Sequence, residues 1–187
     1  MPPALVLLGA GRAPEVAALT ATAGPVLASA LALSLEAPLP PADPHGGLAA
    51  LAERASSSGS GALVPLPLDP GEPLADGSTW AEALGAWRQP ALLLITAEQQ
   101  ASGLAAAMVA LARQEGVPLA GLIQWGLPWR PELRRRQGLP WLGVVEASRR
   151  GEADGALETP DLALALALAC ARLDLAPAAE GAAEGAD

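Results

Sequence analysis

Short apolar runs alternate with stretches of helical pattern along most of this chain, and that alternation constrains the fold more than any other feature. Five runs have the length and apolar content of buried strands, at residues 5–8, 63–66, 92–95, 119–124 and 142–145. The run around 92–95 reads ALLLI, which is typical of a strand buried on both faces. Strands that alternate with helices through short loops predict a single-domain, doubly wound α/β fold, with a mainly parallel sheet and helices on both faces.

Residues at the segment ends set the expected helices. Pro14 is a favourable first helical residue, and we expect that helix to end at Gly24-Pro25. Residues 26–35 fit a strand or a helix, and we interpret them as a strand. Ser78 is the predicted N-cap of a helix through Trp87. Further helices are predicted over residues 48–55, 101–115, 131–137 and 159–173.

Two segments are expected to lie outside regular structure. SSSGSG at residues 56–61 has the composition of a flexible loop. The acidic repeat at 176–187 lacks large apolar side chains and is predicted to be disordered, which leaves residues 1–175 as the α/β domain.

The charge balance limits the partners. The formal net charge is −9, with 11 basic residues, all of them arginine, against 20 acidic ones. Nucleic-acid binding depends on basic side chains that neutralise phosphates, so neither nucleic acid nor an anionic membrane surface is expected as a partner. No signal peptide is visible, and the longest apolar stretch, 162–171, is about half of the roughly twenty residues that span a membrane. With a single cysteine, Cys170, a cytoplasmic protein is expected.

From about His45 to Val145, the order of segments resembles dethiobiotin synthetase, the ATP-dependent enzyme that closes the ureido ring in biotin synthesis. Pro44-His45 and the following Leu48-Ala49-Ala50 look like the family's P-H-L-A-A stretch. SSGSGALVPL at 57–66 is similar to E-G-A-G-G-L-L-V-P-L, GVPLAGLIQWG at 116–126 to GLPVLGLVLNG, and GLPWLGVV at 138–145 to GLPVLGVLP. The resemblance implies a P-loop NTPase fold, ATP and Mg²⁺ as cofactors, a small carboxylate as ligand and a dimer-type surface for a second copy or a protein partner.

The departures from that family fall at its functional positions. No segment matches the phosphate loop G-x-x-x-x-G-K-[ST], whose lysine neutralises phosphate charge, and this chain contains no lysine. The family's loop acid aligns with Ser57, and its adenine-reading asparagine with Trp125. The resemblance therefore implies a degenerate or N-terminally shortened member that has lost ATP-dependent ligase activity and holds no cofactor.

Two alternatives stay open. One is a non-catalytic protein-interaction or small-anion-binding module on the same scaffold. The other is an enzyme with different chemistry around Gly9 to Arg12 and His45.

Two places could carry that chemistry. Gly9, Gly11 and Arg12 lie between a predicted strand and a predicted helix, and a helix N-terminus presents free N–H groups to phosphate. A plain tight turn is the competing interpretation. His45 is the only candidate general base, although a lone loop histidine is usually solvated. One histidine and one cysteine cannot build a zinc site, so no metal is predicted.

The densest basic run is Arg134-Arg135-Arg136, preceded by Arg130. Guanidinium groups suit phosphate, carboxylate or protein partners, which makes this run a candidate anion or partner patch. The competing and favoured interpretation is a solvated helix face paired with nearby acids. The acids and the neighbouring tryptophans, which could stack on a ring or on guanidinium groups or pack in the core, are Glu132, Glu146, Glu152, Trp125, Trp129 and Trp141.

Overall fold

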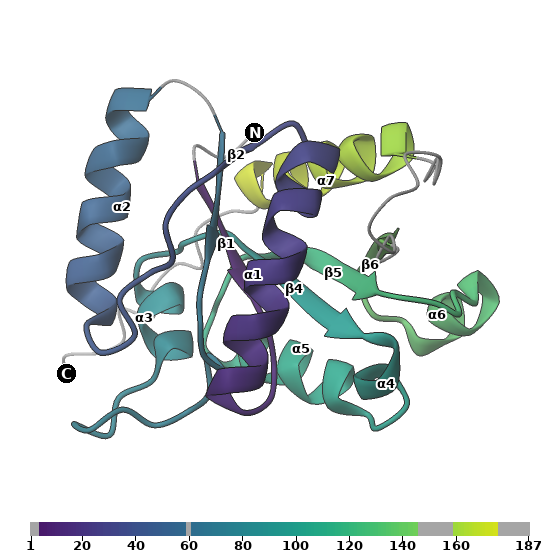
Figure 1. The fold of residues 1–187 in the computed structure, drawn as a ribbon, viewed down its shortest axis with the longest axis horizontal. Helices are drawn as coiled ribbons and strands as arrows, with labels where there is room; N and C mark the ends of the chain where they lie inside the picture. The colour runs from purple at the N-terminus through teal and green to yellow at the C-terminus, as the bar shows by residue number, and fades with distance from the viewer. Residues whose placement is uncertain (1–3, 59–60, 146–158, 176–187) are drawn as a thin grey trace, which may run out of the picture.

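The computed structural model describes residues 4–58, 61–145 and 159–175. In these residues, six strands form one parallel sheet in the order β2-β3-β1-β4-β5-β6, with helices on both faces (Figure 1). The strands are β1 (Ala4–Leu8), β2 (Ser34–Leu35), β3 (Ala62–Pro65), β4 (Ala91–Thr96), β5 (Leu119–Trp125) and β6 (Trp141–Val145). The helices are α1 (Ala13–Ala30), α2 (Pro44–Ser58), α3 (Trp80–Ala86), α4 (Ala97–Gln100), α5 (Leu104–Gln114), α6 (Pro131–Gln137) and α7 (Thr159–Leu175). The prediction of a doubly wound α/β fold is confirmed.

Strand β1 lies in the middle of the sheet and is buried along its whole length. It pairs in parallel with β3, where Val6 faces Val64, and with β4, where Leu7 faces Leu92. Successive side chains of a strand point to opposite faces, so alternate β1 residues enter two separate cores. All five predicted strands lie within one residue of the observed ones.

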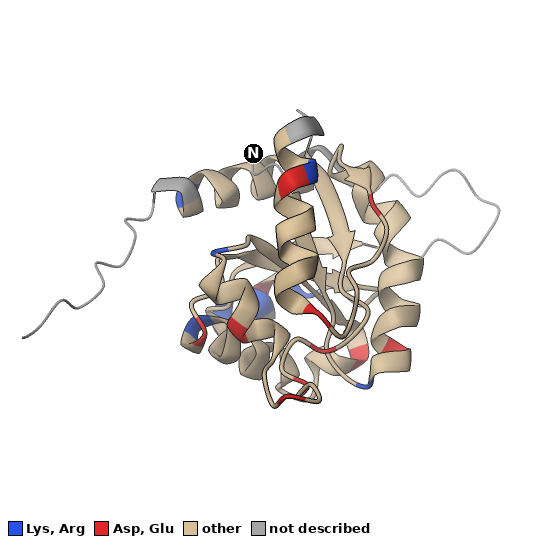
Figure 2. Ribbon diagram, turned by 90° about the vertical axis from the view of Figure 1, so that its left-hand side faces the viewer, with Lys and Arg blue, Asp and Glu red and all other residues tan. Residues whose placement is uncertain are grey.

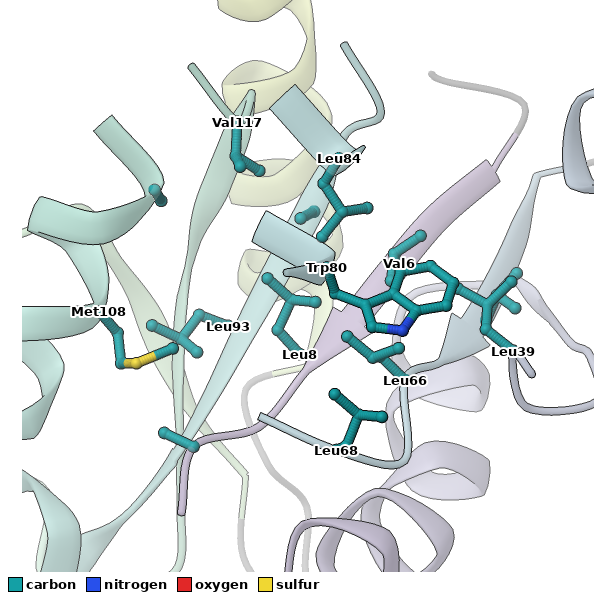
Figure 3. Close-up of a cluster of buried hydrophobic side chains, with 14 of the residues drawn as sticks. Val6, Leu8, Leu39, Leu66, Leu68, Trp80, Leu84, Leu93, Met108 and Val117 are labelled. Carbon is teal, nitrogen blue, oxygen red and sulfur yellow. The ribbon is translucent and has the colours of Figure 1, made fainter. Parts of the chain in front are cut away.

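Helices α2, α3 and α5 cover one face of the sheet, and α1 and α7 cover the other. On the first face, the fully buried Trp80 of α3 lies among Val6, Leu39 and Leu66 (Figure 3). Its Nε1–H donates to the Pro41 carbonyl at 2.9 Å, which satisfies the only polar group of the indole. Because the ring is buried and its N–H is bonded to Pro41, Trp80 anchors the loop before α2.

Helix α1 corrects the prediction that a helix ends at Gly24-Pro25 and that residues 26–35 form a strand. The helix continues through Pro25 to Ala30, and β2 spans only Ser34–Leu35. A proline inside a helix costs about 3 kcal/mol, but each fully buried leucine stabilises by roughly 1.5–3 kcal/mol. Leu27, within the helix, and Leu31, at its C-cap, are both buried, and together they offset that cost.

Three smaller boundaries also differ. The N-cap of α3 is Thr79 rather than Ser78, and its side chain forms a capping box with Glu82. The helix expected over 101–115 is observed as α5 and begins at Leu104, because its N-cap Gly103 has a φ of 80°; the short helix α4, which precedes it, was not predicted. The short helix expected at 48–55 extends over Pro44–Ser58, so α2 includes part of SSSGSG; residues 59–60 and the tail at 176–187 lie outside the described residues.

Charged positions are spread over several elements, and uncharged residues make up most of the ribbon (Figure 2). In the part of the chain that the structure describes, no helix combines the length and apolar character needed to cross a bilayer.

Candidate functional site

The carboxyl ends of parallel strands gather at one edge of the sheet, where ligands of open α/β folds bind. Four residues at or near this edge provide hydrogen-bonding groups. Gly11 lies in the turn after β1, Asp69 follows β3, Gln99 follows β4, and Gln124 lies near the end of β5. The sheet order places β3, β1, β4 and β5 side by side, so the loops from these strands are neighbours.

The candidate phosphate turn already holds an anion from the chain itself. The Gly11 N–H donates to Asp69 Oδ2 at 2.8 Å, and the Gly71 N–H donates to Asp69 Oδ1 at 2.9 Å. Gly11 has a φ of +116°, which favours glycine, so its N–H is directed at the carboxylate by the turn itself. The Asp69 carboxylate therefore binds the backbone donor that an external phosphate would need.

The same turn is fixed from its other side by Gln99. Gln99 Nε2 donates to the Ala10 carbonyl at 2.7 Å. Thr96 and Gln99 form a capping box around α4, with the Gln99 N–H donating to Thr96 Oγ1 at 3.1 Å and the Thr96 N–H to Gln99 Oε1 at 3.0 Å. The turn after β1 is thus tied to both neighbouring strands.

An open hollow of about 680 Å³ lies beside the turn, and residues of the turn, the first helical residues of α1 and the Asp69 loop line it. Its charged side chains are Arg12, Asp69 and Glu72. Two carboxylates against one exposed guanidinium make this an acidic hollow, which repels phosphate. The turn that contains Gly9, Gly11 and Arg12 therefore lies between β1 and α1 as expected, beside a hollow whose net charge opposes phosphate.

His45 is exposed near the start of α2, and its Nδ1 accepts a hydrogen bond from Trp87 Nε1 at 3.0 Å. The bonded partner is an indole N–H, not a nucleophile or a carboxylate that would activate or orient a catalytic base. Close by, hydrogen bonds from the side chain and the N–H of Ser78 hold the pKa of Asp76 below its ordinary value, with a smaller contribution from His45.

The arginine run divides between surface and interior. Arg130, Arg135 and Arg136 are exposed, and Arg135 pairs with Glu132 at 2.5 Å, as the interpretation of a solvated face expects. That interpretation is wrong for Arg134, which is only 4% exposed. Arg134 points from α6 toward Gln124 on β5, whereas its neighbours Leu133 and Arg135 are exposed. Glu146 and Glu152 lie outside the described residues.

Arg134 is held by Gln124 and by two indoles. Its Nε and Nη2 donate to Gln124 Oε1 at 3.2 and 2.6 Å. Its guanidinium carbon lies 5.5 Å from the ring centre of Trp129 and 5.1 Å from that of Trp141, and the two rings stand at 74° to each other. Of the alternatives left open for the tryptophans, contact with a guanidinium is the one observed for Trp129 and Trp141. Burial lowers the pKa of Arg134, and the charge of Arg130 lowers it further.

Gln124 also orders the loop above this cluster. Its Nε2 donates to the carbonyls of Gly126 and Pro128 at 2.7 and 3.0 Å, and the side chain is fully buried. One amide thus links β5, the loop that carries Trp129, and Arg134 on α6. Sequence reasoning missed Gln124 and Asp69, although a lone polar residue in the apolar run LAGLIQW and an acid just after a buried strand are signals for both.

The residues present do not fit Mg²⁺ or ATP as the resembled family holds them. The backbone donor at the β1–α1 turn is bonded to Asp69, and the sequence has no lysine. Within the described ranges, no group of three or more His, Cys, Asp or Glu side chains lies together as metal ligands would.

Comparison of the sequence with protein-family models and with curated proteins finds no match.

Proposed function

We propose that this chain is a dethiobiotin synthetase-like protein of the biotin-synthesis type that has lost the ATP-dependent ring closure and acts as a binding protein on that α/β scaffold. One observation carries the loss of ATP chemistry: Asp69 Oδ2 accepts the Gly11 N–H at 2.8 Å, at the amino end of α1. The segment resemblance over residues 45–145 supports the choice of scaffold.

The length of the turn supports the same proposal. Only four residues, Gly9 to Arg12, separate β1 from α1. A phosphate loop of the form G-x-x-x-x-G-K-[ST] needs a longer segment whose successive N–H groups surround the phosphates. The second residue of α1 is Pro14, which has no N–H, so the start of this helix offers fewer donors than most.

Charge works in the same direction. A unit charge about 4 Å from another contributes about 1 kcal/mol in water and roughly 4 kcal/mol near a protein surface. The polyphosphate of ATP would meet the Asp69 carboxylate at the donor it needs, with Glu72 in the same hollow. Arg12 is exposed and offers a single compensating charge.

A ring-closure assay tests the proposal. Purified protein is incubated with diaminononanoate, bicarbonate and Mg-ATP, and dethiobiotin is measured by mass spectrometry. We expect no product above a heat-inactivated control. Time-dependent product that scales with protein concentration would contradict the proposal.

The role of Asp69 has its own test. Asp69→Ala removes the internal anion, so we expect inorganic phosphate to bind roughly tenfold more tightly than to wild type in calorimetric titrations. Glu72→Ala is the matched control, because Glu72 lines the same hollow while Asp69 still bonds Gly11. Equal phosphate affinity in Asp69→Ala and wild type would show that the carboxylate does not occupy an anion site.

A second candidate function is a small-anion-binding module. The buried and incompletely paired guanidinium of Arg134 favours it, at a place separate from the β1–α1 turn.

A further inference from the structure

Arg134 has a buried nitrogen that lacks a hydrogen-bond acceptor. A guanidinium carries five N–H donors, and Gln124 Oε1 accepts from Nε and Nη2. Nη1 is buried and has no hydrogen-bond partner among the residues that the structure describes. Buried polar atoms in folded proteins are nearly always paired, so an unpaired, charged donor in a residue that is 4% exposed calls for a physical explanation.

The charge of Arg134 is also without a counter-charge in the described part of the chain. Its acceptor is the neutral amide of Gln124, and the charged group that acts on its pKa is Arg130, which is of the same sign. Glu132, the nearest acid on α6, pairs with the exposed Arg135. The faces of two indoles stabilise a guanidinium only partly, because they carry no net charge.

This guanidinium lies just beneath the surface. Trp129 and Trp141 are each part-exposed, and both contact it. Leu127, in the same loop as Trp129, is 56% exposed, and Leu133, beside Arg134 on α6, is 42% exposed. The buried charge thus contacts one neutral amide and two indoles, and Arg130 is an exposed second cation.

We infer that Arg134, Trp129 and Trp141 form a binding site for a small monocarboxylate, whose oxygen atoms accept hydrogen bonds from Nη1 and whose apolar part lies against the indoles. The ligand reaches Nη1 when the part-exposed indole of Trp129 shifts, because the indole N–H of Trp141 donates to Gln137 Oε1 at 2.9 Å and holds that ring in place. One carboxylate neutralises one buried guanidinium, and planar carboxylates match guanidinium geometry. Phosphate would bring a second negative charge into an apolar setting that has no backbone cradle.

The inference deepens the second candidate function and is independent of the ATP question. Tryptophan fluorescence of the full chain is followed while sodium acetate or sodium butyrate is added, with sodium chloride at matched ionic strength as background. We expect a saturable change, because the indole of Trp129 moves on binding. Butyrate should bind more tightly than acetate by about fourfold for each CH₂ group that is buried. Phosphate, as a third titrant, should give no saturable change.

Four variants separate this site from general charge screening. Arg134→Met should abolish the saturable change, and Trp129→Phe should reduce its amplitude. The exposed arginines of α6 and its N-cap supply a matched pair: Arg130→Gln should weaken butyrate binding several-fold, while Arg136→Gln should leave it unchanged. Circular dichroism checks that each variant folds. If Arg134→Met does not fold, the comparison of Arg130→Gln with Arg136→Gln still tests the site.

Three results would overturn the inference. One is the absence of any saturable change in wild type up to about 100 mM butyrate, which is 100-fold above a Kd of about 1 mM. Another is equal weakening in Arg130→Gln and Arg136→Gln. The third is phosphate binding more tightly than butyrate. None of these results bears on Asp69 or on the loss of ATP binding, which the phosphate and Mg-ATP titrations test separately.

Discussion

Replacing Gln124 with leucine should be one of the most destabilising single changes in the chain. Gln124 Oε1 accepts two hydrogen bonds from the buried Arg134 guanidinium. Each hydrogen bond to a charged group contributes about 1.5–3 kcal/mol, and removing one partner of a buried charge costs about 3–5 kcal/mol. The lost bonds to Gly126 and Pro128 add about 1 kcal/mol each. We expect a loss of roughly 5–7 kcal/mol, of which the Arg134 interaction is the larger part.

A double-mutant cycle isolates that part. Arg134→Met removes the charge and the unpaired Nη1 but leaves Gln124 Oε1 without its donor, so it should cost only about 1–2 kcal/mol. The double variant, Gln124→Leu with Arg134→Met, leaves neither a buried charge nor its acceptor. Its loss should be smaller than the sum of the single losses by at least about 2 kcal/mol.

Urea denaturation at neutral pH measures all four proteins, with the slope of the free energy of unfolding against urea checked for constancy. For a chain of this size, each kcal/mol corresponds to about 2–4 °C in Tm, so Gln124→Leu should lower Tm by roughly 10 °C or more. A loss below about 1 kcal/mol for Gln124→Leu, or strict additivity in the cycle, would refute the reasoning that the amide holds a buried, otherwise unpaired charge.

Two further predictions concern other parts of the fold. Gly85→Ala in α3 should destabilise by at least about 2 kcal/mol in urea denaturation, although alanine favours helices, because the added Cβ would meet the backbone carbonyl of Glu115; an unchanged or raised stability would contradict this packing. Ser78→Ala should raise the pKa of Asp76 toward its ordinary value of 3.8, as read from an NMR titration, because it removes the hydroxyl hydrogen bond that is the largest cause of the lowered pKa, while the bond from the backbone N–H remains. A depressed carboxyl pKa favours the folded state above 3.8, and this contribution disappears as the pH falls through the folded value, so wild type and Ser78→Ala should differ in stability at neutral pH and converge in strong acid.

Five of the six described strands could be predicted because each is an apolar run too short for a helix and bounded by turn residues; β2, with only Ser34 and Leu35, gives no such signal. The second half of α1 could not, because Gly24-Pro25 has the local chemistry of a helix end. What overrides that chemistry is tertiary: Leu27 and Leu31 are buried beneath the helix, and Gly24 lets Leu35 approach to 3.2 Å from the position where a Cβ would stand. A prediction from neighbouring residues in the sequence cannot include either contact, because both are made with the rest of the fold.

The candidate site was predictable in part for the same reason. The turn at Gly9 to Arg12 was found from the order strand, glycine, helix, but the anion it binds is Asp69, which is 58 residues from Gly11. The arginine run was found from its composition, yet only the fold distinguishes Arg134 from Arg135, since the partner of Arg134 lies on β5. Residue type thus indicated which groups carry charge, and long-range contacts decided which of them are occupied.

Isothermal titration of the wild-type chain with Mg-ATP tests the central claim most directly, because that claim is that the amino end of α1 is filled by the chain's own carboxylate and cannot hold a nucleotide. The account predicts no saturable heat up to about 1 mM Mg-ATP, which corresponds to a binding free energy weaker than about −4 kcal/mol. A one-to-one isotherm with micromolar Kd would contradict it and would mean that arginines perform the phosphate binding for which this sequence has no lysine.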